Sequence, residues 1–340
     1  MCRAHAGVTK ILDVALRAGV STATVSRALS QPDKVTESTR LRVLAAVGEL
    51  GYEPNPAARS LRTSKTSKLL VTVPDISNPF FSNVIRGVEE AARVADYAVV
   101  LGDTRNDPAL ENQYAGMLRR HEVDGLIFLG HRLPDELARQ AAAAEGLAPI
   151  VNGCEYSPYL GVSSVHIDNE AAGADAIDHL IALGHRRFGV ITGPLESPLS
   201  RDRLAGVQNR IQADEANVEL RIMHGDFSVE SGFDKAAALL AAGVTAIFCF
   251  SDEMAFGALR AMRRLRLACP ADVSIVGFDD IRFALYTTPA LTTIHQPAAD
   301  IGRCAVELLI KTINGNLRAL EVITLPHRLV VRESTGPAPI

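Results

Sequence analysis

The first fifty residues carry apolar side chains at the spacing of short helices. Within Ile11–Leu29, the apolar positions that recur at helical intervals are Val14, Ala15, Ala18, Val25 and Leu29. Gly19 provides the backbone freedom for a sharp turn between two helices, and Ser21 is a favourable N-cap for the second. This stretch predicts two short helices joined by a tight turn.

A third helix is expected after a polar connection. Thr36 can cap it, Gly51 ends it near Leu50, and Pro54 prevents its continuation. The face predicted to pack on the first two helices consists of Leu41, Leu44 and Val47. A bundle of about 50 residues is small but large enough to fold by itself.

From Leu69 onwards, apolar runs of strand length alternate with helical segments. The runs are LLVTVPD, YAVVLGD, GLIFLG, PIVNG, SSVHID, FGVITG, LRIMHGD, AIFCF, VSIVGFD and LTTIH. Helices are expected near residues 80–95, 108–121, 135–145, 169–183, 201–213, 229–242 and 252–265, and within 296–314. Such alternation is typical of parallel sheets that are covered by helices on both faces.

The fold class is therefore α/β, with a three-helix head followed by two doubly wound parallel-sheet subdomains. We expect the head at residues 8–54, a connection at 55–66, the first subdomain at 69–168 and the second at 169–295. Two short closing strands, near 321–325 and 327–332 in the segment 296–335, are expected to cross back to the first subdomain.

The connection contains Asn55–Thr63, where Pro56 suits the first turn of a helix. A helix this short is marginal in water. The segment is therefore either a plain linker or a helix that forms only on a partner, and composition alone favours the linker.

Charge is distributed unevenly along the chain. Residues 1–68 contain 11 basic and 5 acidic residues, whereas the remainder contains 24 basic and 34 acidic ones. A basic head on an acidic body indicates that the head alone meets a polyanion. The outer face of the second helix carries Thr22, Ala23, Ser26 and Arg27, which suit the base edges of the DNA major groove. The alternative is an ordinary helical hairpin in a core.

Other features bear on the compartment and on cofactors. The five cysteines (Cys2, Cys154, Cys249, Cys269 and Cys304) lack metal-ligand spacing. No apolar run approaches the ~20 residues of a membrane span, and the N-terminus has no apolar signal segment. We expect a protein of the reducing cytoplasm that needs no metal or other cofactor.

No catalytic signature is present: a Gly-rich nucleotide loop, HExxH, GxSxG and CxxC are all absent. Asp75, His131, Asp252 and Asp279 follow strands, where ligands bind in such sheets. They either anchor a small neutral ligand or serve as helix caps and loop charges. An enzyme would need a catalytic set, and a pure solute-binding protein would have a signal peptide and no basic head.

The motifs as a whole resemble one family. The head segments DVALRAGVSTATVSRAL and KVTESTRLRVLAAVGELGYEPNPAARSL closely resemble those of the bacterial lactose/galactose repressor family (LacI/GalR). The body resembles that family's effector domain, which is similar to periplasmic sugar-binding proteins. VPDISNPFFSNVIRGVE, FLGHRLP, VHIDN, GDF and LTTIHQP resemble the cytidine-repressor branch in particular. The likeness spans about residues 8–335.

The resemblance implies a homodimeric transcriptional repressor that reads a pseudo-palindromic operator. The second helix would enter the major groove from Ser21, with Thr22, Ala23 and Arg27 nearest the bases and Thr24 and Ser26 nearer phosphates. Asn55–Thr63 matches the family's hinge helix, which overturns the preference for a linker. In it Leu61 would wedge between base steps, Ala58 would allow close approach and Arg59 would reach phosphate.

The resemblance also implies an effector between the subdomains, a nucleoside such as cytidine, or alternatively a purine or sugar. Arg203 and Asp279 match residues that bind ligand hydroxyls. Further matching positions are Asn78, Phe80, Phe81, Phe227, Ser251, Asp252 and Gln296, with Arg132 a weaker assignment. One of the two adjacent phenylalanines would face the cleft and stack on a base or sugar.

Two features concern the ends of the chain. The family often has Thr before Ile11, whereas Lys10 stands here, so Thr9 caps the first helix or the cap is lost. A tetramerisation heptad of the lactose-repressor type is absent from the C-terminal tail, so a dimer is expected.

Overall fold

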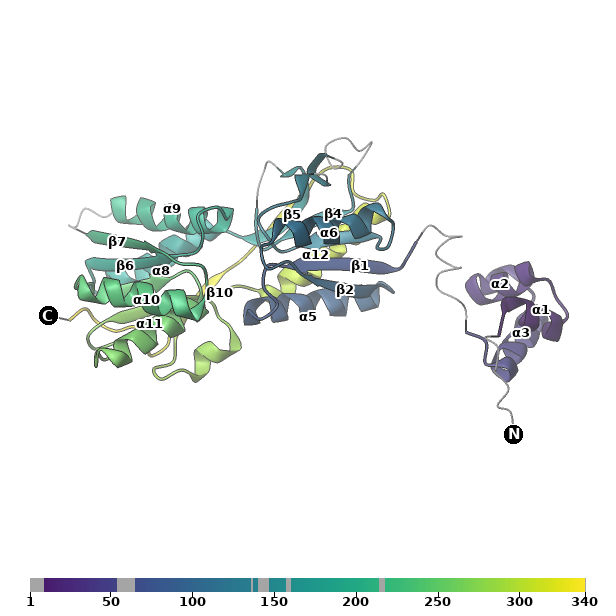
Figure 1. Cartoon of the computed structure of the whole chain (residues 1–340), viewed down its shortest axis with the longest axis horizontal. Coiled ribbons are helices and arrows are strands. Elements are labelled where there is room, and N and C mark those ends of the chain that lie inside the picture. Colours follow the sequence, from purple (N-terminus) through teal and green to yellow (C-terminus); the bar gives the residue numbers. More distant parts are fainter. Residues whose placement is uncertain are drawn as a thin grey trace. The chain divides into compact units, whose positions relative to one another are not determined.

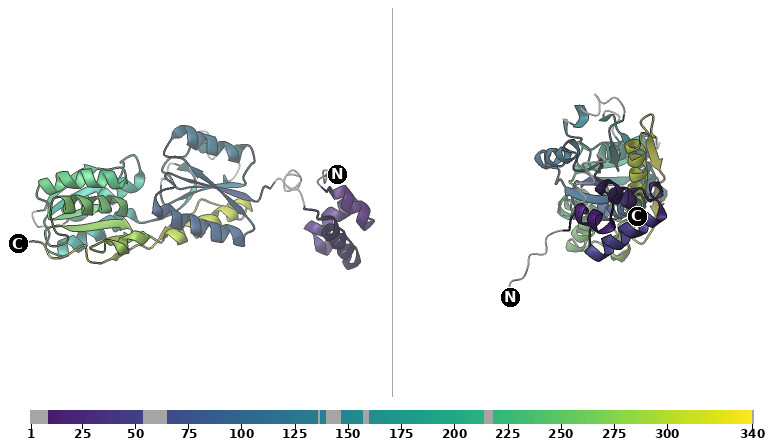
Figure 2. Two further views of the ribbon diagram at one scale, coloured as in Figure 1. Left: turned by 60° about the horizontal axis from the view of Figure 1, so that its bottom comes forward. Right: turned by 90° about the vertical axis from the view of Figure 1, so that its right-hand side faces the viewer.

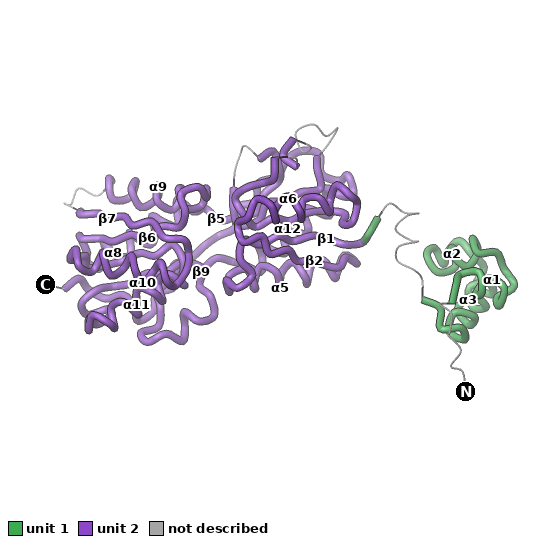
Figure 3. The backbone as a smooth tube through the Cα atoms, viewed as in Figure 1, with its two compact units in different colours: residues 1–66 green, residues 67–340 purple. Residues whose placement is uncertain are grey.

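The computed structural model describes residues 9–53, 65–135, 137–139, 147–156, 160–213 and 218–339. The chain divides into two compact units, with the boundary between Thr66 and Ser67 (Figure 3). The predicted hinge helix Asn55–Thr63 lies outside the described residues, as does most of the helix expected near 135–145.

The N-terminal unit is a helix-turn-helix fold. It contains α1 (Ile11–Ala18), α2 (Thr22–Ser30), the short 3-10 helix η1 (Pro32–Lys34) and α3 (Glu37–Leu50). Gly19 has a left-handed φ of 65° after α1, and the Ser21 hydroxyl accepts a hydrogen bond from the Thr24 N–H at 3.1 Å. Thr36 is the N-cap residue of α3, but its hydroxyl contacts the Thr39 hydroxyl at 2.9 Å instead of a backbone N–H. The three predicted helices are confirmed.

The core of the head differs in detail from the prediction. Its buried side chains are Val14, Ala15, Ala18, Val25, Ala28, Val43 and Ala46. The predicted α3 face was wrong in part, since Leu41 and Leu44 are 59% and 41% exposed and only Val47 packs on the core. Small residues at the contacts let three short helices approach closely, so the larger leucines are left on the outside.

The start of α1 is stabilised without a hydroxyl cap. The Lys10 N–H donates a hydrogen bond to the Asp13 carboxylate at 2.8 Å. The Thr9 hydroxyl donates to the Leu50 carbonyl at the end of α3, at 3.1 Å. Thr9 therefore joins the first and third helices rather than capping α1, and Asp13 supplies one of the missing interactions.

The second unit contains two sheets, each of six strands in the described part of the chain (Figure 1). The first has the order β11-β5-β4-β3-β1-β2. Its strands are β1 (Lys68–Val73), β2 (Ala98–Asp103), β3 (Gly125–Phe128), β4 (Ile150–Gly153), β5 (Ser163–Ile167) and β11 (Val322–Leu325). All its strand pairs are parallel. We call this sheet and its helices the N-subdomain.

The second sheet has the order β12-β10-β9-β8-β6-β7. Its strands are β6 (Arg187–Thr192), β7 (Glu219–His224), β8 (Ala246–Cys249), β9 (Ser274–Asp279), β10 (Thr292–His295) and β12 (Arg328–Val330). Its pairs are parallel except β10–β12. We call this sheet and its helices the C-subdomain. The expectation that both closing strands return to the first sheet was wrong for β12, because it pairs with β10.

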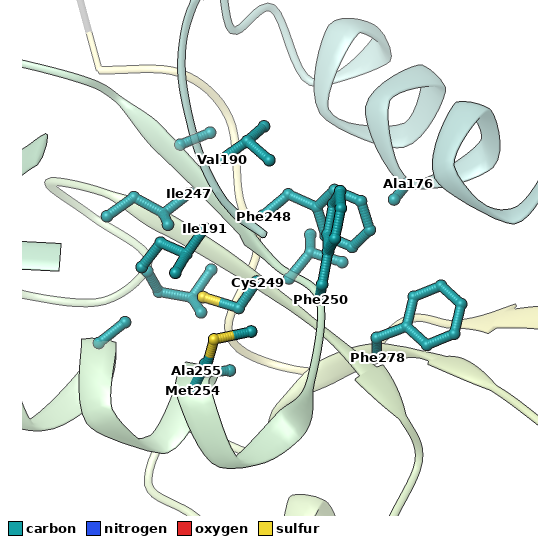
Figure 4. Packing of buried hydrophobic residues seen from close by; sticks show 14 of the residues in the cluster. Ala176, Val190, Ile191, Ile247, Phe248, Cys249, Phe250, Met254, Ala255 and Phe278 are labelled. Atoms are coloured by element: carbon teal, nitrogen blue, oxygen red, sulfur yellow. The ribbon is translucent and has the colours of Figure 1, made fainter. Parts of the chain in front are cut away.

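Helices cover both faces of each sheet, as Figure 2 shows for the first. The N-subdomain has α5 (Pro79–Val94), α6 (Pro108–Arg119) and α12 (Ala298–Ile313), and the C-subdomain has α8 (Asn169–Ala182), α9 (Pro198–Gln212), α10 (Val229–Ala241) and α11 (Asp252–Arg264). Alternate residues of a strand serve opposite faces. In Figure 4, Phe248 of β8 points toward Ala176 of α8, whereas Cys249 points toward Met254 of α11. The predicted strands and doubly wound sheets are confirmed.

Three helix pairs, α5–α12, α8–α9 and α10–α11, cross through glycines on both helices. A Cβ on any of these glycines would lie 1.9–2.3 Å from a backbone atom of the partner helix. The glycines are Gly87, Gly302, Gly173, Gly206, Gly232 and Gly257. The helix axes thus approach closely, which fixes the positions of the helix N-termini at the ends of the strands.

Candidate functional site

The candidate DNA-contacting face lies on α2. Ser21, Thr22, Ala23 and Arg27 are exposed, whereas Thr24 and Ser26 are half-buried and Val25 is fully buried. The Ser21 and Thr24 hydroxyls lie 2.9 Å apart. The buried side of α2 thus holds it on the head while the predicted base-contacting residues face outward. Ala58, Arg59 and Leu61 lie outside the described residues.

The candidate effector site is built around Arg203 of α9, whose guanidinium is buried. Its Nε donates a hydrogen bond to Asn169 Oδ1 at 2.9 Å, and its Nη1 donates to the Phe250 carbonyl at 2.7 Å. The guanidinium also stacks on the Phe278 ring, 3.5 Å from the ring centroid. Burial lowers the pKa of Arg203 to about 10, although the nearby Asp279 and Glu155 carboxyls oppose that change. Arg203 is thus held in one orientation.

Asp279 lies at the carboxyl end of β9, with a left-handed φ of 112°. It accepts a hydrogen bond from Gln296 Nε2 at 2.7 Å. Burial raises the pKa of Asp279 to about 7, while the charge of Arg203 and the hydrogen bond from Gln296 lower it. The structure therefore brings together three predicted ligand residues, Arg203, Asp279 and Gln296, as a cation, a carboxyl and an amide.

Asp252, Ser251 and Phe227 shape the loops around this cluster. Asp252 is fully buried and accepts hydrogen bonds from the Thr293 hydroxyl at 2.6 Å and the Ile281 N–H at 2.8 Å. Burial and then the Asp279 carboxyl raise the pKa of Asp252. Ser251 caps α11 and lies 3.3 Å from the Phe227 carbonyl. One carboxyl oxygen of Asp252 thus holds the loop after Asp279, and the other holds β10.

Phe227 takes a left-handed φ of 72°, and its ring covers Gly193 so closely that a Cβ there would lie 2.0 Å from the ring. The side chain is half-buried. The Phe227 ring can lie against residue 193 only because that residue is a glycine without a side chain.

The predicted N-subdomain residues form a separate group. Asn78 caps α5 by accepting a hydrogen bond from the Phe80 N–H at 2.9 Å. Phe80 is 6% exposed and belongs to the core, whereas Phe81 is half-buried, and the two rings pack edge to face with centroids 5.3 Å apart. Arg132 is ion-paired to Glu111 at 2.9 Å. Among the described residues, no hydrogen bond or ion pair joins this group to Arg203 or Asp279.

Sequence reasoning missed a contact between the subdomains. Glu155, which follows β4, is 5% exposed, and its two carboxyl oxygens lie 2.9 and 3.2 Å from the Ser197 hydroxyl at the start of α9. Burial raises the pKa of Glu155 to about 7, while the Ser197 hydrogen bond lowers it. The available signal was a carboxyl just beyond a strand end, where parallel sheets place their ligands.

The comparisons with known proteins cover both units. Residues 10–55 match the family described as bacterial regulatory proteins, lacI family, and residues 177–335 match a periplasmic binding protein-like domain. The HTH-type transcriptional repressor CytR of Escherichia coli strain K12 is 41% identical over 330 residues, which cover 96% of each chain. The chain belongs to the LacI family of bacterial regulatory proteins. The resemblance stated from the sequence is confirmed.

Solved structures agree with this membership. The Lac repressor dimer bound to operator and the anti-inducer ONPF superposes on this LacI-family chain with a TM-score of 0.85 at 30% identity, covering 96% of this chain and 99% of that one. The complex of the transcriptional regulator CelR with cellobiose gives 0.72 at 33% identity, with the same coverage. This chain is a DNA-binding transcriptional regulator with a ligand-binding domain.

Two further findings concern metals and membranes in the part of the chain that the structure describes. No group of three or more His, Cys, Asp or Glu side chains there could hold a metal ion. No helix in that part of the chain combines the length and apolar character needed to span a bilayer.

Proposed function

We propose that the chain is a homodimeric repressor whose operator binding is controlled by a small effector held by Arg203 and Asp279. The observation that carries this is the cluster at the carboxyl ends of β9 and β10, where buried Arg203 and Gln296 converge with half-buried Asp279. Asn169 and the Phe250 carbonyl hold Arg203, and Gln296 holds Asp279, so the cluster is preorganised to receive a ligand. The open carboxyl ends of the strands are where ligands bind in this class of sheet.

The chemistry of the cluster suits a vicinal diol. Arg203 can only donate hydrogen bonds and Asp279, when ionised, can only accept them, so together they complement two adjacent hydroxyls. Half-buried Phe81 and Phe227 offer aromatic faces for a flat base. A nucleoside, which joins a diol to a base, uses both features, and cytidine is the one that we favour.

A sugar or a purine is the second candidate. The CelR complex contains cellobiose, and the polar groups of this cluster would serve such a ligand as well. A purine would use the aromatic faces but not the diol-binding pair. The identity of the effector is therefore decided by comparing nucleosides, bases and sugars.

Control of DNA binding would operate through the two subdomains. An effector that binds one arrangement of the subdomains more tightly shifts the population toward it. The Glu155–Ser197 contact joins the subdomains beside Arg203, so we propose that it senses this arrangement. The change would reach Asn55–Thr63, where paired hinge helices are proposed to bind the minor groove.

The DNA half of the proposal assigns Thr22, Ala23 and Arg27 to base edges and Ser21, Thr24 and Ser26 to phosphates or positioning. It is supported by the outward orientation of α2 and by the Lac repressor dimer bound to operator. We propose a dimer that places one α2 in each half-site.

Calorimetry of the full chain with nucleosides, free bases and pentoses tests the effector half, and footprinting on an operator selected from random duplexes tests the DNA half. We expect nucleosides to bind and to change operator affinity. No heat from any ligand class, with the footprint intact, would overturn the effector half. No protected duplex would overturn the DNA half.

A further inference from the structure

A cavity lies where the chain passes between the subdomains, apart from the Arg203–Asp279 cluster. It measures about 430 Å³. Its lining comes from the loop after β4, the end of β5, the first turns of α8 and α9, and β11. Its polar and aromatic lining residues are Tyr156, His166, Asp168, Asn169, Glu170, Arg201, Asp202 and Thr324. Neither Arg203 nor Asp279 lines it.

His166 supplies an unused acceptor in this cavity. The residue is 9% exposed, and its Nδ1 lies 2.8 Å from the Ile167 carbonyl, so Nδ1 carries the proton and donates. In the neutral imidazole Nε2 is then an acceptor, and it is buried without a hydrogen-bond partner among the described residues. The Tyr156 ring stacks on the imidazole, with centroids 5.0 Å apart and planes at 17°. A buried acceptor without a donor is costly, which points to a donor that the cavity receives.

Carboxylates dominate the remainder of the lining. Asp168 uses one oxygen to cap α8, and Glu170 accepts from Asn209 Nδ2 at 2.7 Å. Arg201 donates to the backbone carbonyls of Leu195 and Glu196 at 2.8 and 2.9 Å. Its hydrogen bonds thus go to the backbone. Asp168, Glu170 and Asp202 are exposed residues of the lining, and within the described part of the chain no cation is hydrogen-bonded to their carboxyls.

The pKa of Asp202 agrees with an excess of carboxyls over cations in the lining. Partial burial raises the pKa of Asp202, and the carboxyls of Glu170 and Asp168 raise it further. Arg201 and the protonated form of His166 act in the opposite direction without reversing the change. The cavity therefore has an excess of negative charge and of acceptors.

We propose that this cavity is a binding site for a protonated organic amine of the diamine or polyamine class. The ammonium groups would donate to the carboxylates and to His166 Nε2, since an ammonium offers donors and no acceptor. An aliphatic stem would lie against Tyr156 and Pro198. Asp168 and Thr324 belong to two segments that lead from one subdomain to the other, so a bound amine would bias their arrangement.

The lining of the cavity also includes a residue that holds Arg203 in place. Asn169 lines the cavity and accepts the hydrogen bond from Arg203 Nε at 2.9 Å. An effect of the amine on effector affinity is therefore expected, and this consequence alone rests on the proposed function. Amine binding itself does not depend on it.

Calorimetry of the full chain with spermidine and putrescine tests the proposal. Mg²⁺ is the control for non-specific cation binding. Asp202→Asn replaces one carboxyl oxygen with an amide nitrogen, and His166→Phe keeps an aromatic ring but removes both ring nitrogens. We expect each to weaken amine binding by about tenfold or more, since a hydrogen bond to a charged group is lost. Asp234→Asn, on the exposed face of α10, is the matched control and should bind like the wild type.

Circular dichroism establishes that each variant is folded before its affinity is compared. Saturable amine binding that both cavity variants weaken and the control retains supports the site. No saturable binding of either amine, equal binding by Asp202→Asn and the wild type, or equal competition by Mg²⁺ would each overturn it. Because these readouts involve neither effector nor operator, failure here leaves the proposed function untouched.

Discussion

Glu155 of the N-subdomain and Ser197 of the C-subdomain are hydrogen-bonded in a buried site, with the serine hydroxyl 2.9 and 3.2 Å from the two carboxyl oxygens. The pair joins the loop after β4 to the N-cap residue of α9, the helix that carries Arg203. A carboxyl at a helix N-terminus is favourably placed toward the helix dipole. The contact therefore couples the relative position of the subdomains to the helix that presents the proposed ligand-binding cation.

The first prediction concerns the pH dependence of stability. The pKa of Glu155 in the folded chain is about 7, above its ordinary value of 4.5. The stabilisation that this carboxyl contributes is therefore complete below pH 4.5 and is lost as the pH rises to about 7. Glu155→Gln keeps an acceptor for Ser197 but does not titrate. We expect its unfolding free energy to fall by about 3 kcal/mol less than that of the wild type over this window.

Urea unfolding of the full chain, followed by circular dichroism at several pH values across that window, measures the difference. The unfolding free energy of the variant will still fall with pH in this window, because burial also raises the pKa of Asp279 to about 7. Glu307→Gln, an exposed carboxyl on α12, should keep the wild-type slope. Equal slopes for the wild type and Glu155→Gln would contradict the prediction.

The second prediction concerns Arg203→Lys. Lysine retains the charge but cannot make both N–H bonds of the fixed guanidinium or stack on Phe278. We expect effector binding to weaken by about tenfold to a hundredfold in calorimetry. Arg210→Lys on the same helix lies in an ion pair with Asp178 and should bind effector normally. Undiminished affinity in Arg203→Lys would remove Arg203 from the site.

The third prediction tests the close crossing of α8 and α9. In Gly173→Ala the new Cβ would lie 2.3 Å from the Arg203 carbonyl oxygen, so the helices must separate. We expect a loss of about 1–3 kcal/mol in stability together with weaker effector binding. Gly48→Ala in α3 meets nothing within 4 Å and should be neutral or stabilising, since alanine favours a helix. Denaturant titration compares the stabilities of the two variants. Equal losses would show that the close crossing of α8 and α9 is not the cause of the destabilisation.

The fourth prediction concerns base recognition by Arg27. Arg27→Ala should lose about 1–3 kcal/mol of discrimination at one base pair in each half-site. Arg42→Ala removes the same charge from an exposed position on α3 and should leave the base preference unchanged. Binding to a panel of single-base operator variants distinguishes the two. A uniform loss across the panel for Arg27→Ala would show a phosphate contact instead.

The fifth prediction concerns the proposed wedge. Leu61→Ala should weaken operator binding and reduce the DNA bend while leaving the head folded, because the apolar group that would unstack the central step is gone. Leu61→Met retains an apolar wedge and serves as the matched variant. Gel-shift assays on circularly permuted fragments measure both quantities. Wild-type affinity and bend in Leu61→Ala would exclude the wedge.

Much of the fold followed from local patterns. The turn at Gly19, the Ser21 cap and the alternation of apolar runs with helices located nearly every described element, because these signals act over a few neighbouring residues. The resemblance located Arg203, Asp279 and Gln296, which the structure joins. The choice between a linker and a helix at Asn55–Thr63 depends on a partner that the residues themselves do not reveal.

The sequence by itself determined the helix-turn-helix head, the two parallel sheets and the family, since each rests on periodicity or on contiguous motifs. Only the tertiary structure decided that Val43 and Ala46 rather than Leu41 and Leu44 face the head core, and that β12 pairs with β10. It alone paired Glu155 with Ser197, 42 residues apart, and formed the cavity beside His166. Such contacts depend on how close two backbones can come, and no short-range pattern along a chain encodes that distance.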